Sequence, residues 1–109
     1  MSAILEFRFH LPPLMFLVLL TYTASLEVID SHLAAHREFL QRHYDAGTLL
    51  ISGPKEPRDG GVILARAESA EQLQQVLAED PFHQHGVATY QVLQFTPRMA
   101  APELQHLLA

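Results

Sequence analysis

An unbroken apolar run from Leu14 to Leu20 dominates the first third of the chain, with two prolines in front of it and Thr21 and Tyr22 behind it. A helix needs about 20 mainly apolar residues to cross a bilayer, so this run is too short to span a membrane. Runs rich in Phe, Val and Leu between turn residues are typical of strands that are buried on both faces. We therefore predict a strand over 15–22.

The same run could be the apolar centre of an export signal. The residues in front of it include Glu6 beside a single Arg8, and the triplet 23–25 is a poor cleavage site. We therefore expect no export, and the absence of cysteine fits a cytoplasmic protein. Residues 5–11 alternate between apolar and polar, which permits a short amphipathic strand before the prolines.

Two segments carry apolar residues at helical spacing. The first runs from Leu26 to Tyr44, and it is followed by Gly47, a residue that readily takes the left-handed conformation at helix ends. The second begins with a capping box at Ser69 and ends before Pro81. The pattern predicts two helices.

Three further segments indicate strands or turns. Residues 48–52 and 62–67 flank a loop with two prolines and three glycines, which predicts an antiparallel hairpin. The β-rich run 87–95 predicts the last strand. The tail after it can add one or two helical turns, with Pro102 at the first position.

The predicted order is strand, helix, strand, strand, helix, strand. With right-handed crossovers, its compact solution is a four-stranded antiparallel sheet with both helices on one face, the ferredoxin-like βαββαβ fold of the α+β class. Side chains alternate along a strand, so the first strand has two apolar faces, and the helices cover only one of them. We expect a second copy of the chain to cover the other, in a homodimer formed through the sheet. The two faces consist of Met15, Leu17 and Leu19, and of Phe16, Val18 and Leu20.

Composition narrows the classes of function. The chain of 109 residues is one domain, and its formal net charge is -5, with 12 acidic and 7 basic residues and no basic cluster. This balance gives no reason to bind nucleic acid. Without cysteine, disulfides, thiol nucleophiles and cysteine-bound metals are excluded.

Several of the seven histidines need an explanation. His32 and His36 have the spacing of two metal ligands on one helix, but no HExxH pattern or third ligand accompanies them, so we predict no metal site. His83 and His85 fit solvated loop residues. His36 borders the apolar stripe of the first helix, which fits either a packed core imidazole or a functional group.

Asp80 is the most unusual carboxylate. It comes directly before Pro81, at the predicted C-terminal end of the second helix, where the helix dipole disfavours negative charge. We expect a partner to offset this cost. The alternatives are an Asp-Pro turn and a solvated acid beside Glu79.

In order and spacing, the segments "MFLVLLTYT", "AAHREFLQRHYDAGTLLISGP", "GGVILARAES" and "LAEDPFHQHGVATYQVLQFTP" resemble the YCII-related (YciI-like) family. The resemblance covers 15–98. It divides the chain into an N-terminal extension of residues 1–14, a YCII-like domain of residues 15–98 and a C-terminal tail of residues 99–109.

The resemblance implies a dimeric α+β barrel of the ferredoxin-like type. The family's suspected catalytic histidine and aspartate match His36 and Asp80, and Ser52 matches a further family position. One relative removes chloride from a chlorinated hydroxyquinol, and muconolactone isomerases share the barrel. This implies proton transfer on small, often aromatic-derived molecules.

The chemistry of these residue types agrees with that implication. An imidazole can take and return a proton near neutral pH, and a carboxylate on its far nitrogen fixes its tautomer. We therefore expect a lyase, isomerase or dehalogenase without a cofactor, in which His36 is the acid and base and Asp80 orients it. Ser52, or backbone amides of the "SGP" segment, would donate to an enolate oxygen. Two alternatives stay open: a non-catalytic dimer that binds a small ligand or serves as an accessory protein, and a cofactor-free oxygenase.

Overall fold

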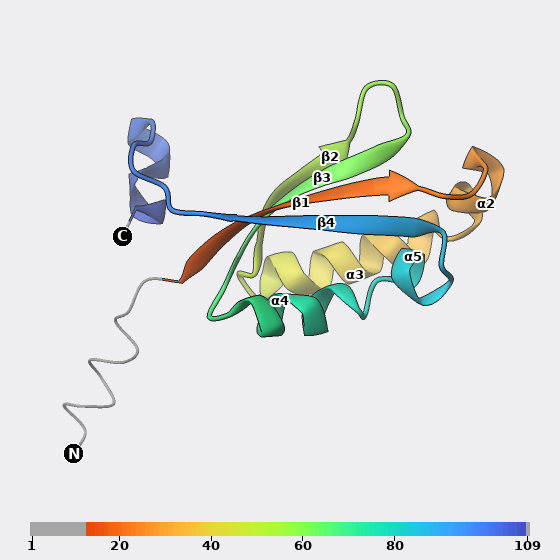
Figure 1. The fold of residues 1–109 in the computed structure, drawn as a ribbon, viewed down its shortest axis with the longest axis horizontal. Coiled ribbons are helices and arrows are strands. Elements are labelled where there is room, and N and C mark those ends of the chain that lie inside the picture. The colour runs from red at the N-terminus through yellow and green to blue at the C-terminus, as the bar shows by residue number, and fades with distance from the viewer. Residues whose placement is uncertain (1–12, 109) are drawn as a thin grey trace, which may run out of the picture.

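The centre of the fold is a four-stranded antiparallel sheet with the strand order β2-β3-β1-β4. The computed structural model describes residues 13–108, so the strand expected over 5–11 lies outside the described residues. The long central strand β1 pairs with β3 on one side and with β4 on the other (Figure 1). The strands are β1 (Leu14–Tyr22), β2 (Leu49–Pro54), β3 (Gly60–Ala67) and β4 (Ala88–Phe95).

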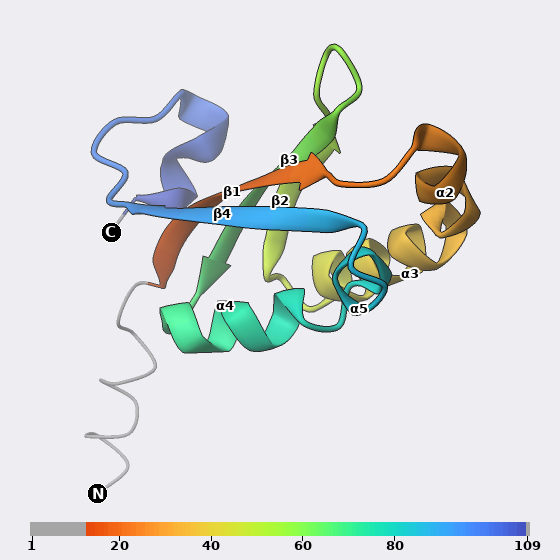
Figure 2. The same ribbon diagram turned by 45° about the vertical axis from the view of Figure 1, so that its right-hand side comes forward.

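The helices α3 and α4 lie against one face of this sheet, as both views show (Figures 1 and 2). The ferredoxin-like α+β class predicted from the sequence is thereby confirmed. None of the helices within residues 13–108 is long and apolar enough to cross a membrane. The helices are α2 (Leu26–Ser31), α3 (Leu33–Asp45), α4 (Ala70–Leu77), α5 (Pro81–Gln84) and the 3₁₀ helix η1 (Pro102–Leu107).

The first predicted helix is divided into α2 and α3, so the expectation of one continuous helix is wrong. The break lies at His32, whose φ of -106° and ψ of 2° depart from helical values. Just before it, the Ser31 hydroxyl donates to the carbonyl of Val28 at 2.5 Å, a local bond that competes with the helical backbone. The predicted stop is confirmed, because Gly47 follows α3 with a φ of 81°.

The second predicted helix begins as expected, since the Ser69 hydroxyl accepts from the backbone N–H of Gln72 at 3.0 Å. It ends earlier, at Leu77, and a separate short helix α5 follows from Pro81. Asp80 is therefore the N-cap of α5, and its Oδ1 accepts from the Phe82 N–H at 3.0 Å. The expected placement at a helix C-terminus is wrong, because a carboxylate at an N-cap is favourable.

The predicted hairpin of β2 and β3 is confirmed, but β2 contains an irregularity that the sequence does not reveal. A register shift between Leu49 and Ile51 changes which side chains face the helices. Leu49 is buried under the helices, whereas Ile51 is 66% exposed on the other face. Ser52, opposite Ile63 of β3, returns to the helix side.

The two faces of the sheet are buried to different degrees. On the helix side Phe16, Val18 and Leu20 are at most 2% exposed and pack with α2, α4 and α5 in one core. The opposite face is here called the open face, and of its three predicted β1 residues Met15 is 3% exposed, whereas Leu17 and Leu19 are half-buried. The open face also includes Ile51, Leu93 and Phe95, which are 44–66% exposed.

Candidate active site

A histidine from α3 and an aspartate from the start of α5 form a buried pair. The Nδ1 atom of His36 lies 2.8 Å from Oδ1 of Asp80, although 44 positions separate the two residues. The His36 side chain is 11% exposed, and that of Asp80 is fully buried. The structure thus brings together the two residues to which the sequence assigned the chemistry.

The carboxylate of Asp80 has partners on both oxygens. Besides His36, Oδ1 accepts from the Phe82 N–H, and Oδ2 accepts from the hydroxyl of Tyr90 at 2.6 Å. Burial, and then the bond to Asp80, raises the pKa of Tyr90 above its usual range, so this phenol stays a donor. Because every partner points at one carboxylate, its position and that of the His36 ring are fixed together.

Tyr90 is the residue of this network that sequence reasoning missed. It lies opposite Leu20 in the pairing of β1 with β4, so the alternation of β4 places it on the helix side. A polar residue at an inward position of a predicted strand was the available signal. The β-rich pattern alone did not show which carboxylate it would meet.

The protonation of the His36 ring follows from its contacts. An ionised carboxylate only accepts hydrogen bonds, so the proton of the neutral ring is assigned to Nδ1. Nε2 has no hydrogen-bond partner among the described residues. Because no buried side-chain nitrogen or oxygen among these residues lacks a partner, Nε2 must be accessible, and we assign it to the cavity described next. Phe82 supports the ring face to face, with centroids 4.0 Å apart and planes 8° from parallel.

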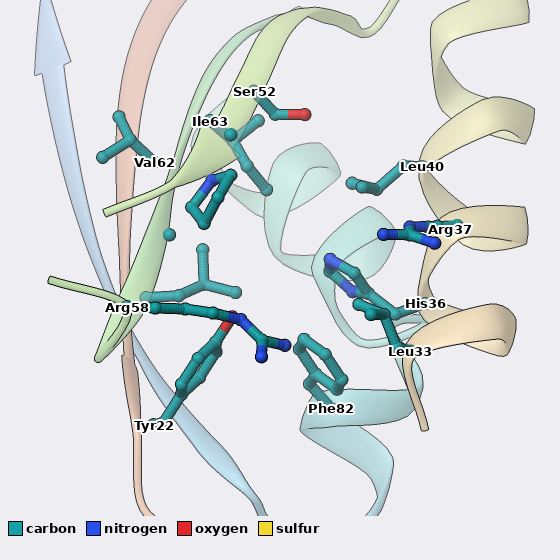
Figure 3. Close-up of a pocket in the computed structure, with 14 residues that line it drawn as sticks. Tyr22, Leu33, His36, Arg37, Leu40, Ser52, Arg58, Val62, Ile63 and Phe82 are labelled. Carbon is teal, nitrogen blue, oxygen red and sulfur yellow. The ribbon is translucent and has the colours of Figure 1, made fainter. Parts of the chain in front are cut away.

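His36 forms part of the wall of a cavity of about 310 Å³ between α3 and the strands β1, β2 and β3. Figure 3 shows its ring pointing into this space from α3. Asp80 is not part of the cavity wall, so of the pair only His36 can touch a molecule in the cavity. The wall consists of Leu20, Tyr22, Leu33, His36, Arg37, Leu40, Ser52, Gly53, Pro54, Arg58, Gly61, Val62, Ile63 and Phe82.

Ser52 reaches the same cavity from β2 (Figure 3). Its hydroxyl shares a hydrogen bond with the hydroxyl of Tyr44 on α3. A serine held in this way can still donate to, or accept from, a molecule in the cavity. Without the irregularity in β2, this position would face away from the helices.

The remaining histidines within the described residues lie outside the cavity wall. His32 stacks on His85 with ring centroids 4.1 Å apart, and His83 is exposed on α5 rather than in a loop. His43 bonds to Glu79 at 3.0 Å, and this contact, with Arg42 nearby, lowers the pKa of the Glu79 carboxyl. Across residues 13–108, no three histidine, aspartate or glutamate side chains form a group that could hold a metal ion.

These features define a ferredoxin-like α+β protein with a buried His-Asp pair in the wall of a small cavity. The model of the YCII-related domain matches residues 15–96, and the chain belongs to this family. The resemblance noted in the sequence is therefore confirmed. Comparison with curated protein sequences finds no match.

Two of the solved structures that match this chain illustrate the shared fold. One is 5-chloro-2-hydroxyhydroquinone dehydrochlorinase (TftG) from Burkholderia phenoliruptrix AC1100, in complex with 2,5-dihydroxybenzoquinone. It is 22% identical, with a TM-score of 0.67 over 75% of this chain and 93% of that chain. The other is SnoaB, a cofactor-independent oxygenase from Streptomyces nogalater, 16% identical, with a TM-score of 0.50 over 84% of this chain and 99% of that chain.

Proposed function

We propose that this protein is a small-molecule enzyme that transfers a proton with His36 as acid and base and Asp80 as its orienting partner. The observation that carries the proposal is the 2.8 Å contact between Nδ1 and a fully buried carboxylate, with Nε2 facing a cavity. This arrangement leaves the lone pair of Nε2 free to accept a proton from a bound molecule.

The proposed step needs no oxidant or cofactor. Nε2 takes a proton from a hydroxyl or from a carbon next to a carbonyl, and the freed electron pair forms a new double bond or an enolate. In an isomerisation, the imidazolium returns the proton at another atom. In an elimination, a leaving group such as chloride departs with the electrons of its own bond. Asp80 stabilises the imidazolium in either case.

Ser52 has the proposed role of donor to the developing enolate oxygen. Its bond to Tyr44 supports this role, because the tyrosine can hold the hydroxyl in place without covering it. A donor that is already oriented stabilises developing charge without reorganising during the reaction.

The cavity and the name of one structural neighbour support a proposed substrate class. A cavity of about 310 Å³ is at the small end for ligand sites, which favours a single-ring or short-chain molecule. TftG is named as a 5-chloro-2-hydroxyhydroquinone dehydrochlorinase, so chlorinated hydroxyquinols are the first compounds to assay.

The test measures proton exchange and chloride release with small candidate substrates. The protein is incubated in D₂O with chlorinated hydroxyquinols and small enolisable ketones and lactones, and NMR detects carbon-bound deuterium while an electrode detects chloride. With any compound turned over, His36→Ala and Asp80→Asn should each lose about 10²-fold or more. His32→Ala is the matched control, because this half-buried ring stacks on His85 outside the cavity, and it should keep full activity.

Equal turnover by the parent protein and by both variants would contradict the proposal. Binding of these compounds without exchange or chloride release in any of them would favour the alternative, a non-catalytic small-ligand-binding or accessory protein.

We further propose that the protein is a homodimer in which the open faces of two sheets pack together. Ile51 is 66% exposed, and Leu93 and Phe95 are 44% exposed, so apolar area remains for a partner to cover. A second copy presents the same surface, and a two-fold interface is self-complementary. A cytoplasmic location stays a prediction from composition.

A further inference from the structure

The charge of the cavity wall differs in sign from that of the chain. The chain has a formal net charge of -5, yet none of the described residues that form the wall is an aspartate or glutamate. The wall includes two arginines, Arg37 and Arg58, beside the imidazole of His36. A cavity whose wall contains positively charged side chains, in a protein that is acidic as a whole, is suited to a negatively charged ligand.

The two arginines differ in how far their charge is already neutralised. Arg58 lies in the loop between β2 and β3 and pairs with Asp30 of α2 at 2.5 Å. Arg37 follows His36 on α3, and no carboxylate of the described residues lies within ion-pair distance of Arg37. Both arginines lower the pKa of Asp30, and the hydrogen bond from Arg58 has the largest effect. Figure 3 shows the guanidinium of Arg37 directed toward the cavity beside the His36 ring.

We infer that the cavity binds a small organic anion, a carboxylate or an enolate-type oxyanion, whose charged group contacts the guanidinium of Arg37. The guanidinium has the planar donor geometry that matches such groups. Leu33, Leu40 and Phe82 supply an apolar surface for the carbon skeleton. The inference rests on the proposed function for its site, and it adds the charge of the substrate and the residue that selects it.

Arg58 has a different role in this arrangement. Its pair with Asp30 connects the hairpin loop to α2 at the side of the cavity, and its charge is shared with that carboxylate. Arg58 therefore positions the wall, while Arg37 provides the charge that distinguishes an anion from a neutral molecule of the same shape.

The test compares ligands that differ only in charge: propionate with propionamide, benzoate with benzamide, and 4-hydroxybenzoate with 4-hydroxybenzamide. Dissociation constants are measured by NMR titration. In at least one pair the anion should bind the parent protein about tenfold or more tightly. Arg37→Gln should reduce this preference to about twofold or less, and added salt should weaken anion binding.

Arg42→Gln is the matched control, because Arg42 lies on the same helix and is exposed like Arg37, but pairs with Glu79 outside the cavity. It should keep the preference. No preference in any pair, or a preference that survives Arg37→Gln, would overturn the inference. A parent protein that binds none of these ligands at millimolar concentration would overturn it as well.

His36→Ala separates this inference from the proposed function. The variant should keep the anion preference, because the preference depends on Arg37. If the preference is present but His36→Ala leaves turnover unchanged, only the proposed function fails. If His36→Ala abolishes turnover but no ligand pair shows a preference, only the inference fails.

Discussion

The two faces of the sheet share the strand β1 but have different surroundings. On the helix side, Phe16, Val18 and Leu20 are at most 2% exposed, whereas Leu93 and Phe95 on the open face are each 44% exposed. The apolar pattern is similar on both faces, so the pattern alone does not decide burial. On the helix side all three of these β1 residues are buried, whereas burial on the open face is uneven, since Met15 is 3% exposed and Leu17 and Leu19 are half-buried. The cavity with His36 occurs on the covered side.

The largest expected effect is on the covered face. Phe16→Ala should lower the free energy of unfolding by about 3–5 kcal/mol, because it leaves a void in a packed core. Leu17→Ala, one position along, is the comparison on the open face. Urea unfolding followed by circular dichroism measures both.

Only the cost of Leu17→Ala should change with protein concentration, because in the proposed homodimer a second copy covers Leu17, whereas Phe16 is buried within its own chain. Equal costs that are both independent of concentration would remove the distinction between the faces.

The next effect concerns assembly. Leu93→Asp places a charge within the proposed interface and should convert a dimer into a monomer in sedimentation equilibrium. Gln75→Asp adds the same charge at an exposed position of α4 and should leave the mass of the dimer unchanged. A parent protein that sediments as a monomer at micromolar concentration would contradict the proposed homodimer.

A smaller effect is expected at the carboxylate behind His36. Tyr90→Phe removes a donor from the fully buried Asp80 and should cost about 1–3 kcal/mol in urea unfolding. Leu104→Ala is the control, because it shortens an exposed side chain in the C-terminal tail and should lower the free energy of unfolding much less than Tyr90→Phe. A cost for Tyr90→Phe as small as that of the control would show that the bond does not stabilise the buried carboxylate.

The same tyrosine predicts a dependence on pH. Burial and the bond to Asp80 raise its pKa in the folded protein, so its contribution is complete below the unfolded pKa of about 10 and is lost as the pH rises above it. Above that pH, the unfolding free energy of the parent protein should fall more steeply than that of Tyr90→Phe. Parallel curves would contradict the raised pKa.

The sequence predicted the fold well because its signals are local. The alternation in β1, the helical spacing after Leu26 and the cap at Ser69 each depend on neighbouring residues, and the family resemblance pointed to the same order of elements. The irregularity in β2 is not such a signal, so the side on which Ser52 lies came only from the structure.

The site was predictable in its members but not in its geometry. The family resemblance singled out His36 and Asp80, yet the helix boundaries placed Asp80 at the wrong helix end. The hydroxyl of Tyr90 and the guanidinium of Arg37 depend on contacts between distant parts of the chain, which spacing does not encode.

The proposed function depends on Asp80 holding the His36 ring with its proton on Nδ1 and its bare Nε2 toward the cavity. Nitrogen-15 NMR of the histidine rings, at a pH where the His36 ring is neutral, measures this directly. We expect a protonated Nδ1 and an unprotonated Nε2 for His36, and we expect Asp80→Asn to lose the preference for this tautomer. A proton on Nε2, or an averaged signal like that of the exposed His83, would contradict it.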